Sequence, residues 1–407
     1  MSKYRLSFLL LIVLFASFSI NAQEVEDTIK IKTRVVFLDA LVKDKKTNLP
    51  ISSLTSENFA VLDDGKPRNI SYFTREGQAR KPLALVLILD LREDGAGRFL
   101  KRTEILKAME DELAKLPPGD EVAIMAMDMN EDEERLWLTE FTNDRAKLAE
   151  ALARVPAMCE FHEGAAPSEV KKVETAQGEG KPDDIVETET IRGRNGAVIT
   201  RKTRRDGTVN VTRTNKDGNV TIELGDVYDM AAAVKDATRK AAELRPNSQT
   251  SIVWVSDGIA PIFFEDRDAT EQILIRDNVI FNSLTVELRT LFKFLMPIGK
   301  PIAGWMGLSL YGSAKFLAQR SGGEAVKVGR VKDYGAGLQR IIGNLTARYS
   351  LGFALAEDEN DDGRMHSLEV RVNAKDEKGK TRKLQVSSRQ GYYMSSTVPK
   401  DAAAKAQ

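Results

Sequence analysis

Two continuous apolar runs dominate the hydrophobic pattern of this chain. They cover Leu83 to Asp90 (LALVLILD) and Ser251 to Asp257 (SIVWVSD), and each ends in an aspartate. Continuous apolar runs of about seven residues are typical of strands that are buried on both faces of a parallel sheet. In such sheets, ligands bind beside the carboxyl ends of the strands. The pattern therefore predicts two carboxylates at one edge of a sheet, where a cation or a cation-bridged partner can bind.

Strand and helix patterns alternate on both sides of these runs. Apolar residues at helical spacing predict helices at residues 98–116, 229–244 and 313–320, and a short helix after Thr142-Asn143-Asp144. Further strand patterns cover residues 121–127, 135–141 and 278–287. This alternation predicts a doubly wound α/β domain with a mostly parallel sheet over residues 80–345.

A β pattern precedes this domain in residues 23–79. The run IKIKTRVVFLDALVKD alternates apolar and polar residues, and Asp63-Asp64-Gly65 has the composition of a hairpin turn. A β unit of about 50 residues is only marginally stable by itself. We therefore expect this N-terminal β segment to pack against another part of the chain.

Residues 159–225 interrupt the α/β pattern with a charged insertion. Its second half repeats every 11 residues, which places Gly196, Gly207 and Gly218 in register, each after an Asn or Asp. Such pairs tolerate the positive φ of a type I′ turn, so the repeats predict a β-meander of about four strands that stands out from the domain. A flexible solvated loop is the alternative. As an arm, the insertion offers an exposed edge on which a partner can dock.

The first 22 residues have the pattern of an export signal. Lys3 and Arg5 precede an apolar run from Phe8 to Ile20, and Ala22 is the small residue preferred before a cleavage site. A membrane anchor is the alternative, but the run is shorter than the roughly 20 residues of a spanning helix. We therefore expect export, with the mature protein in the periplasm or outside the cell.

No membrane span is expected after signal cleavage. The apolar segment at residues 288–310 contains two prolines and two lysines, so a packed helix and loop is the expected structure. Residues 395–407 are expected to form a disordered tail.

Composition narrows the classes of function. Sixty basic side chains balance sixty acidic ones, so nucleic-acid binding through a general basic surface is unsupported. Cys159 is the only cysteine, which excludes an intramolecular disulfide. The two histidines, His162 and His366, are too few for a histidine-rich zinc site, and their polar neighbours favour exposed side chains. Motifs of phosphate loops, serine hydrolases and zinc proteases are absent from the sequence, so we expect a non-enzymatic protein.

A second candidate ion site lies at residues 358–369. DENDDG is followed after five residues by Glu369, which is the spacing of a calcium-binding loop. An EF-hand loop lies between helices, whereas the flanks here, YSLGFAL and SLEVRV, have strand patterns. An acidic hairpin loop is therefore the favoured interpretation, and weak calcium binding is the alternative.

Several segments together resemble a known family. The order of VVFLDALVKD and LTSENFAVLDDGKPRNISYF, then LVLILD, then WVSDG, then LTARYSLGFAL and SSRQGYY is similar to bacterial exported proteins described as von Willebrand factor A-related. The resemblance covers nearly all of the chain outside residues 1–22 and the insertion, and it is most specific at residues 54–73 and 348–393. It implies a von Willebrand factor A fold. It also implies that residues 346–394 form a C-terminal β segment that pairs with the N-terminal one in a β-sandwich.

Such domains commonly hold a divalent cation at a metal-ion-dependent adhesion site. The family pattern is D-x-S-x-S after the first strand, a threonine before a later helix, and an aspartate after the fourth strand. Asp90 and Asp257 match the two aspartates, but Arg92 and Asp94 stand where the serines are expected. Gly225 or Asp226 stands at the position of the threonine.

These departures leave two interpretations of the sheet edge. Arg92 offers only donors and a fixed positive charge, so it can replace the ion by pairing with Asp90 or Asp257. Asp94 adds a carboxylate that can rebuild a site with Asp90 and Asp257 for Mg²⁺ or Ca²⁺. In either case Arg92 is a candidate for binding a carboxylate of the partner.

The expected function is a non-enzymatic protein-binding, adhesion or scaffolding module with a degenerate metal site. A purely structural module of the cell envelope, with no metal-dependent binding, is the alternative. The sequence does not define the identity of the protein partner or the oligomeric state.

Overall fold

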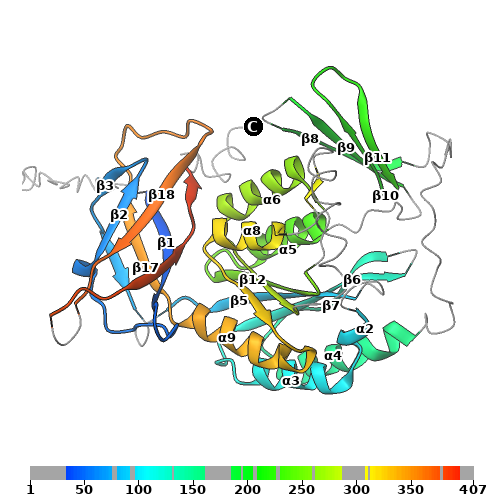
Figure 1. Cartoon of the computed structure of the whole chain (residues 1–407), viewed down its shortest axis with the longest axis horizontal. Coiled ribbons are helices and arrows are strands. Elements are labelled where there is room, and N and C mark those ends of the chain that lie inside the picture. The colour runs from blue at the N-terminus through cyan, green and yellow to red at the C-terminus, as the bar shows by residue number, and fades with distance from the viewer. Residues whose placement is uncertain are drawn as a thin grey trace, which may run out of the picture. The chain divides into compact units, whose positions relative to one another are not determined.

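A computed structural model gives the fold of the chain (Figure 1). It describes residues 34–75, 80–91, 97–130, 133–160, 185–193, 196–204, 209–225, 230–258, 262–286, 308–309, 312–375 and 379–394. The predicted export signal and C-terminal tail lie outside these residues, as does most of the apolar segment at 288–310. Within the described part of the chain, no helix has both the length and the hydropathy of a membrane span.

A six-stranded sheet forms the centre of the α/β part. Its strand order is β16-β14-β12-β5-β6-β7, and only β7, at one edge, runs antiparallel to its neighbour. The strands are β5 (Leu83–Asp90), β6 (Glu121–Asn130), β7 (Glu133–Thr142), β12 (Gln249–Ser256), β14 (Ile280–Val286) and β16 (Ala325–Val328). Every residue of β5 is buried, as its continuous apolar run predicts.

Helices cover both faces of this sheet. One face packs against α2 (Gly97–Leu100), α3 (Thr103–Ala114), α4 (Arg145–Glu160) and α9 (Tyr334–Thr346). The other packs against α5 (Met230–Leu244), α6 (Phe264–Arg276) and α8 (Ser313–Ser321). Side chains of β5 alternate between the two cores, because successive residues of a strand point to opposite faces. The predicted doubly wound α/β fold is thus confirmed.

Two four-stranded antiparallel sheets are built from both ends of the described chain. Their orders are β19-β1-β17-β4 and β20-β18-β2-β3. The strands are β1 (Val35–Asp44), β2 (Phe59–Asp63), β3 (Lys66–Arg68), β4 (Tyr72–Thr74), β17 (Tyr349–Ala354), β18 (Met365–Val372), β19 (Leu384–Ser388) and β20 (Gly391–Tyr393). A core of apolar and aromatic side chains lies between the sheets. The N-terminal and C-terminal β segments therefore pair, as the family resemblance implied.

Buried polar contacts connect these β sheets to the α/β part. The ammonium group of Lys43 on β1 pairs with Glu324, which also accepts a hydrogen bond from the amide of Asn344 on α9. Arg389, which follows β19, donates to the carbonyl of Ile275 on α6 at 3.2 Å. Arg348 donates to the carbonyl of Gly322 at 2.7 Å.

The insertion forms the predicted meander. Strands β8 (Ile185–Arg192), β9 (Val198–Arg204), β10 (Val209–Thr214) and β11 (Val220–Gly225) are antiparallel and lie in sequence order. Gly196 and Gly218 have φ of 79° and 82°, as their turns require. Gly207 and residues 161–184 lie outside the described residues.

The meander is anchored to the α/β part by buried charges. Asp266 in the first turn of α6 accepts hydrogen bonds from Arg201 on β9 at 2.7 Å and from Lys235 on α5 at 2.8 Å. Both cations also contact Glu189 on β8, at 2.8 and 3.1 Å. The neighbouring Glu265 accepts from Arg213 on β10 at 2.8 Å. Figure 1 shows β8–β11 beside α5 and α6.

Some elements differ from the sequence predictions. Helices α6 and α9 were not predicted, and α4 is a 16-residue helix where a short one was expected. Two short 3₁₀ helices, Ser56–Asn58 and Val331–Asp333, and a two-stranded pair, β13 (Ile262–Phe263) and β15 (Leu308–Ser309), complete the described elements.

Candidate functional site

Asp90 and Asp257 lie at the carboxyl ends of two adjacent parallel strands. Asp90 is the last residue of β5, and Asp257 directly follows β12, which pairs with β5. In the sheet, β6 lies on one side of β5 and β12 lies on the other. The strand order therefore reverses between β5 and β12. Ligands of doubly wound sheets bind in the crevice outside such a point. The structure therefore brings the two predicted carboxylates to the expected edge, and both are buried.

The hydroxyl of Ser256 connects the two carboxylates. Ser256 Oγ donates to Asp90 Oδ2 at 2.5 Å and lies 3.4 Å from Asp257 Oδ1. It also accepts a hydrogen bond from the backbone N–H of Gly258 at 3.2 Å. Gly258 has φ of 89°, a left-handed conformation that turns the chain immediately after Asp257. Ser256 thus contacts both carboxylates and the backbone of the turn that follows them.

Tyr334 closes the site from the side of α9. Its hydroxyl donates to the carbonyl oxygen of Ser256 at 2.9 Å, and its side chain is fully buried. Burial raises the pKa of Tyr334, and the negative charges of Asp257 and Asp90 raise that pKa further. Tyr334 therefore remains a neutral hydrogen-bond donor beside the two carboxylates.

Several residues of the expected site lie outside the described residues. They are Arg92, Asp94 and Asp226. Gly225, the other candidate for the threonine position, ends β11 and pairs with Asn210 of the meander. The assignments of Asp94 as a metal ligand and of Arg92 as a partner-binding residue therefore stay predictions.

The described donors of this edge are all oxygen atoms. Two carboxylates and one hydroxyl form the kind of donor set that Mg²⁺ and Ca²⁺ prefer. The residues present therefore fit a hard divalent cation. The same carboxylates can pair with an arginine, so the donor set fits both interpretations of the sequence.

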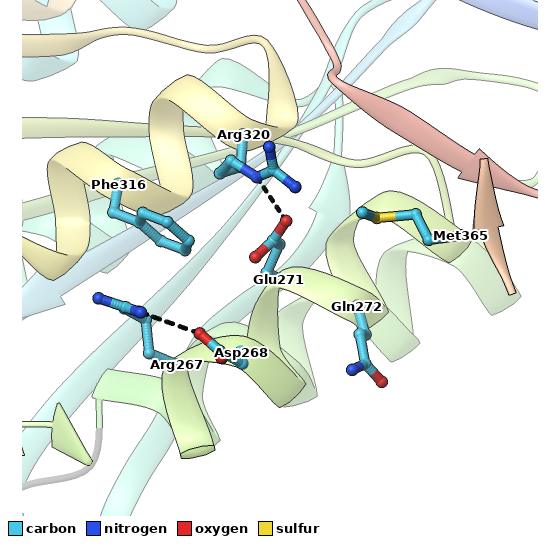
Figure 2. A pocket seen from close by; sticks show the side chains of 7 residues that line it. All are labelled: Arg267, Asp268, Glu271, Gln272, Phe316, Arg320 and Met365. Atoms are coloured by element: carbon cyan, nitrogen blue, oxygen red, sulfur yellow. Dashed lines mark hydrogen bonds and ion pairs between the residues drawn. The ribbon is translucent and has the colours of Figure 1, made fainter. Parts of the chain in front are cut away.

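A cavity of about 230 Å³ lies between α6, α8 and the start of β18. Figure 2 shows the side chains that line it: Arg267, Asp268, Glu271, Gln272, Phe316, Arg320 and Met365. Arg267 lies over the ring of Phe316 at 4.1 Å and pairs with Asp268 at 3.0 Å, while Arg320 pairs with Glu271 at 2.5 Å. Because each arginine has an acidic partner in the wall, the cavity has no charge preference that would define a ligand class.

The acidic segment at residues 358–369 is a loop between strands, as favoured by the sequence. It connects β17 to β18, and Glu369 lies within β18, where it pairs with Arg371 on the surface. Because Glu369 lies in a strand, its side chain cannot fold back onto the loop, so the calcium-loop interpretation is wrong.

The prediction that His366 is exposed is also wrong, because the residue is only 3% exposed. His162 lies outside the described residues.

Two residues of the sheet edge were missed by sequence reasoning, namely Ser256 and Tyr334. Ser256 had a usable signal, because it is a hydroxyl residue within an otherwise apolar run and directly precedes Asp257. Tyr334 had none, since its contact with Ser256 spans 78 positions and depends on the packing of α9.

No family model and no curated protein matches this chain. Among solved structures, it is similar to the von Willebrand factor A domain of SpRpn10, with 8% identity, a TM-score of 0.31, and coverage of 62% of this chain and 93% of that one. The observed architecture is a doubly wound, mostly parallel sheet with helices on both faces. The central sheet, its helical layers and the edge that carries Asp90 and Asp257 are the features that the sequence resemblance implied.

Further similar structures are proteins of diverse roles. Manganese-loaded TRAP protein of Plasmodium vivax has 11% identity and a TM-score of 0.33, with coverage of 79% of this chain and 97% of that one. The pilus adhesin SpaC of Lactobacillus rhamnosus GG has 6% identity and a TM-score of 0.35, and this chain spans 47% of its length. Similarity at this level does not extend to partners or metal content.

Proposed function

We propose that this chain is a non-enzymatic protein-binding module that contacts its partner at the carboxyl edge of the central sheet. The observation that carries the proposal is the pair of buried carboxylates, Asp90 and Asp257, held together by Ser256 at the reversal point of the strand order. Two acidic side chains buried at a sheet edge need a cation close to them. In this proposal the partner meets that cation at the same edge of the sheet.

The cation is either a divalent ion or a guanidinium group. Mg²⁺ or Ca²⁺ would be held by Asp90, Asp257 and the hydroxyl of Ser256, with Asp94 as a further candidate ligand, and would attract a carboxylate of the partner. Without an ion, Arg92 neutralises the edge and binds the carboxylate of the partner directly. Both routes select an acidic side chain on the partner protein.

The proposal places this activity outside the cytoplasm, in the periplasm or at the cell surface. Its support is the sequence of residues 1–22, with basic residues, an apolar run and a small residue before the cleavage position. Divalent cations are available there at concentrations that weak sites require.

Calorimetric titration with Mg²⁺ and then Ca²⁺ tests the ion. The purified, chelator-treated chain is compared with Asp257→Ala and with Glu140→Gln, a control that removes an exposed carboxylate on β7. Heat that is lost in Asp257→Ala and kept in Glu140→Gln supports the metal route. If the unaltered chain gives no heat that depends on Asp257, the metal route is refuted and Arg92 is the counter-ion to examine.

Partner binding is tested with the same variants. Proteins from a cell-envelope extract are retained on the immobilised chain, on Asp257→Ala and on Glu140→Gln, and are compared quantitatively. Selective loss in Asp257→Ala supports binding at the sheet edge. Equal retention by all three chains contradicts binding at the sheet edge and favours the alternative, a structural module of the cell envelope. The buried ion pairs that anchor the meander are the observation in favour of this alternative.

A further inference from the structure

Asp63, Asp64 and His366 meet at one end of the paired β sheets, in a different sheet from Asp90 and Asp257. Asp63 ends β2, and Asp64 begins the turn to β3 with φ of 48°. His366 is the second residue of β18, the strand that pairs with β2. The backbone N–H of Ser367 donates to Asp64 Oδ1 at 2.8 Å, which holds the Asp64 carboxylate beside β18.

The two oxygens of the Asp63 carboxylate have different surroundings. Oδ2 accepts hydrogen bonds from Arg68, at 2.7 Å from Nη2, and from the hydroxyl of Tyr392 at 3.0 Å. Oδ1 is buried and has no hydrogen-bond partner among the described residues. It lies 3.9 Å from His366 Nδ1, and the whole Asp63 side chain is 3% exposed. A buried carboxylate oxygen without a partner requires an explanation, such as an ion.

His366 is oriented by a carboxylate on its far side. Its Nε2 lies 3.2 Å from Asp362 Oδ1, and its Nδ1 lies 3.1 Å from Asp64 Oδ2. When Nε2–H donates to Asp362, the lone pair of Nδ1 points toward Asp64 and the unpartnered oxygen of Asp63. Metal-ligating histidines have this arrangement, in which a second carboxylate fixes the tautomer and the ring orientation.

The charges around this group do not balance. Among the described residues, the carboxylates of Asp63, Asp64 and Asp362 face the guanidinium groups of Arg68 and Arg364. Three negative charges against two positive ones leave this group acidic before His366 is counted. A divalent cation offsets this excess.

We propose that Asp63 Oδ1, Asp64 Oδ2 and His366 Nδ1 bind a divalent first-row transition ion of the Zn²⁺ type. These ligand atoms already lie within 4.8 Å of one another, and ligands of tetrahedral Zn²⁺ are roughly 3.4 Å apart. An imidazole nitrogen favours Zn²⁺ over Ca²⁺ or Mg²⁺. Asp64 is 33% exposed, so an ion can enter from solvent and keep water in its remaining position.

Arg364 acts as a competitor at this site. Its Nη1 lies 2.9 Å from Asp64 Oδ2, the atom proposed as a metal ligand. Its side chain is 57% exposed, so it can move into solvent when the ion binds. The bound ion connects the β2–β3 turn with β18 and thereby joins the N-terminal and C-terminal β segments. Because it binds only the folded chain, it raises the melting temperature.

Calorimetric titration of the chelator-treated chain with Zn²⁺ tests the proposal, with Co²⁺ absorption as a second signal from the ligand field. Asp64→Asn is the main variant, because Asn tolerates the left-handed backbone at this position. We expect it to bind Zn²⁺ at least tenfold more weakly and to remain folded by circular dichroism. Asp362→Asn should lose roughly tenfold or more in affinity through the orientation of His366.

Two further variants separate the site from a general acidic surface. Glu369→Gln removes an exposed carboxylate from the same strand, and Zn²⁺ affinity should stay unchanged. Arg364→Gln removes the competing guanidinium, and Zn²⁺ affinity should rise. Asp257→Ala should keep Zn²⁺ binding here, and Asp64→Asn should keep any Mg²⁺ heat of the sheet edge, so the two proposals succeed or fail separately. Zn²⁺ heat that is absent, or that persists in a folded Asp64→Asn chain, would overturn the proposal.

Discussion

One hydroxyl contacts both carboxylates of the sheet edge. Ser256 is fully buried and donates its only proton to Asp90 at 2.5 Å. A hydrogen bond to an ionised acceptor contributes more to stability than a neutral one, and its loss leaves the acceptor buried. The edge is therefore organised by Ser256 as much as by the two aspartates.

We expect Ser256→Ala to lower the free energy of unfolding by about 1.5–3 kcal/mol, the usual contribution of a hydrogen bond to a charged group. Urea unfolding followed by the fluorescence of Trp254, which is buried on the same strand, measures the change. Ser71→Ala is the control, because its exposed hydroxyl contacts only the carbonyl of Gly352 at 3.3 Å. Equal effects in both variants would show that the Ser256 hydroxyl has no special role.

Individual residues were predicted unevenly from the sequence. Asp90 and Asp257 were located because each ends a buried run, and strand ends of a parallel sheet must meet at one edge. His366 was misjudged because its immediate neighbours are polar. Its period-two phase was the better signal, since Leu368 and Val370 lie on the same buried face of β18.

Helix α6 is an element whose buried face is partly charged. Glu265 and Asp266 in its first turn, and Glu271 in the next, are buried. Glu265 pairs with Arg213. Asp266 pairs with Arg201 and Lys235, and Glu271 pairs with Arg320. A search for apolar periodicity cannot find such a helix, because several of the residues that face the protein are of types usually exposed.

Helix α9 was missed for a different reason: glycines at 335 and 337 interrupt its apolar pattern, yet Gly337 allows close packing against Leu284.

Asp266→Asn should weaken the attachment of the meander and lower the stability of the fold. Removing this charge leaves Arg201 and Lys235 buried without a full counter-charge, so we expect the free energy of unfolding to fall by about 3–5 kcal/mol. Urea unfolding measures the loss. Glu140→Gln breaks the exposed pair between Glu140 and Lys240 and should change stability by less than about 1 kcal/mol.

The pH dependence of stability gives a second measure of Asp266. Burial alone would raise the pKa of Asp266, but the charges and hydrogen bonds of Arg201 and Lys235 outweigh burial and lower it below its ordinary value of 3.8. A carboxyl group with a lowered pKa in the folded state stabilises the fold above pH 3.8, and this contribution is lost as the pH falls below that value. Acid unfolding of Asp266→Asn should therefore be less steep there than that of the unaltered chain. Identical slopes would contradict the assignment.

At the scale of the whole molecule, the β sheets and the α/β part are joined by close backbone packing. Gly322 ends α8 with φ of 84°, and a Cβ atom there would lie 2.5 Å from the backbone nitrogen of Arg389. Arg389 in turn donates to Ile275 on α6, and Lys43 pairs with Glu324 next to the same turn. The sequence could predict each part through its periodicity and family resemblance. It could not predict this junction, because contacts between distant segments leave no local pattern.

Gly322→Ala measures the closeness of this junction. Gly363→Ala is a matched control, because Gly363 also has positive φ, 71°, but open space where a Cβ would be. Both variants bear the backbone penalty of about 1–2 kcal/mol for a left-handed alanine, and only Gly322→Ala adds a clash with the backbone of residues 388 and 389. We expect a larger loss of unfolding free energy in Gly322→Ala. Equal losses of unfolding free energy in the two variants would mean that the backbone at the junction can move aside for the added Cβ atom without destabilising the fold.

The pairing of β1 has a consequence for how the chain is made. Both neighbours of β1 come from the other end of the chain: Val35 pairs with Ala354, and Ala40 pairs with Ser388. During synthesis β1 therefore keeps open edges until β17 and β19, more than 300 positions further along the chain, have appeared. Pairing over so large a separation is intrinsically slow, and unpaired strand edges promote aggregation. A chain cut short after α9 would leave β1 with neither of its neighbours, so β17 and β19 decide whether β1 can join a sheet at all.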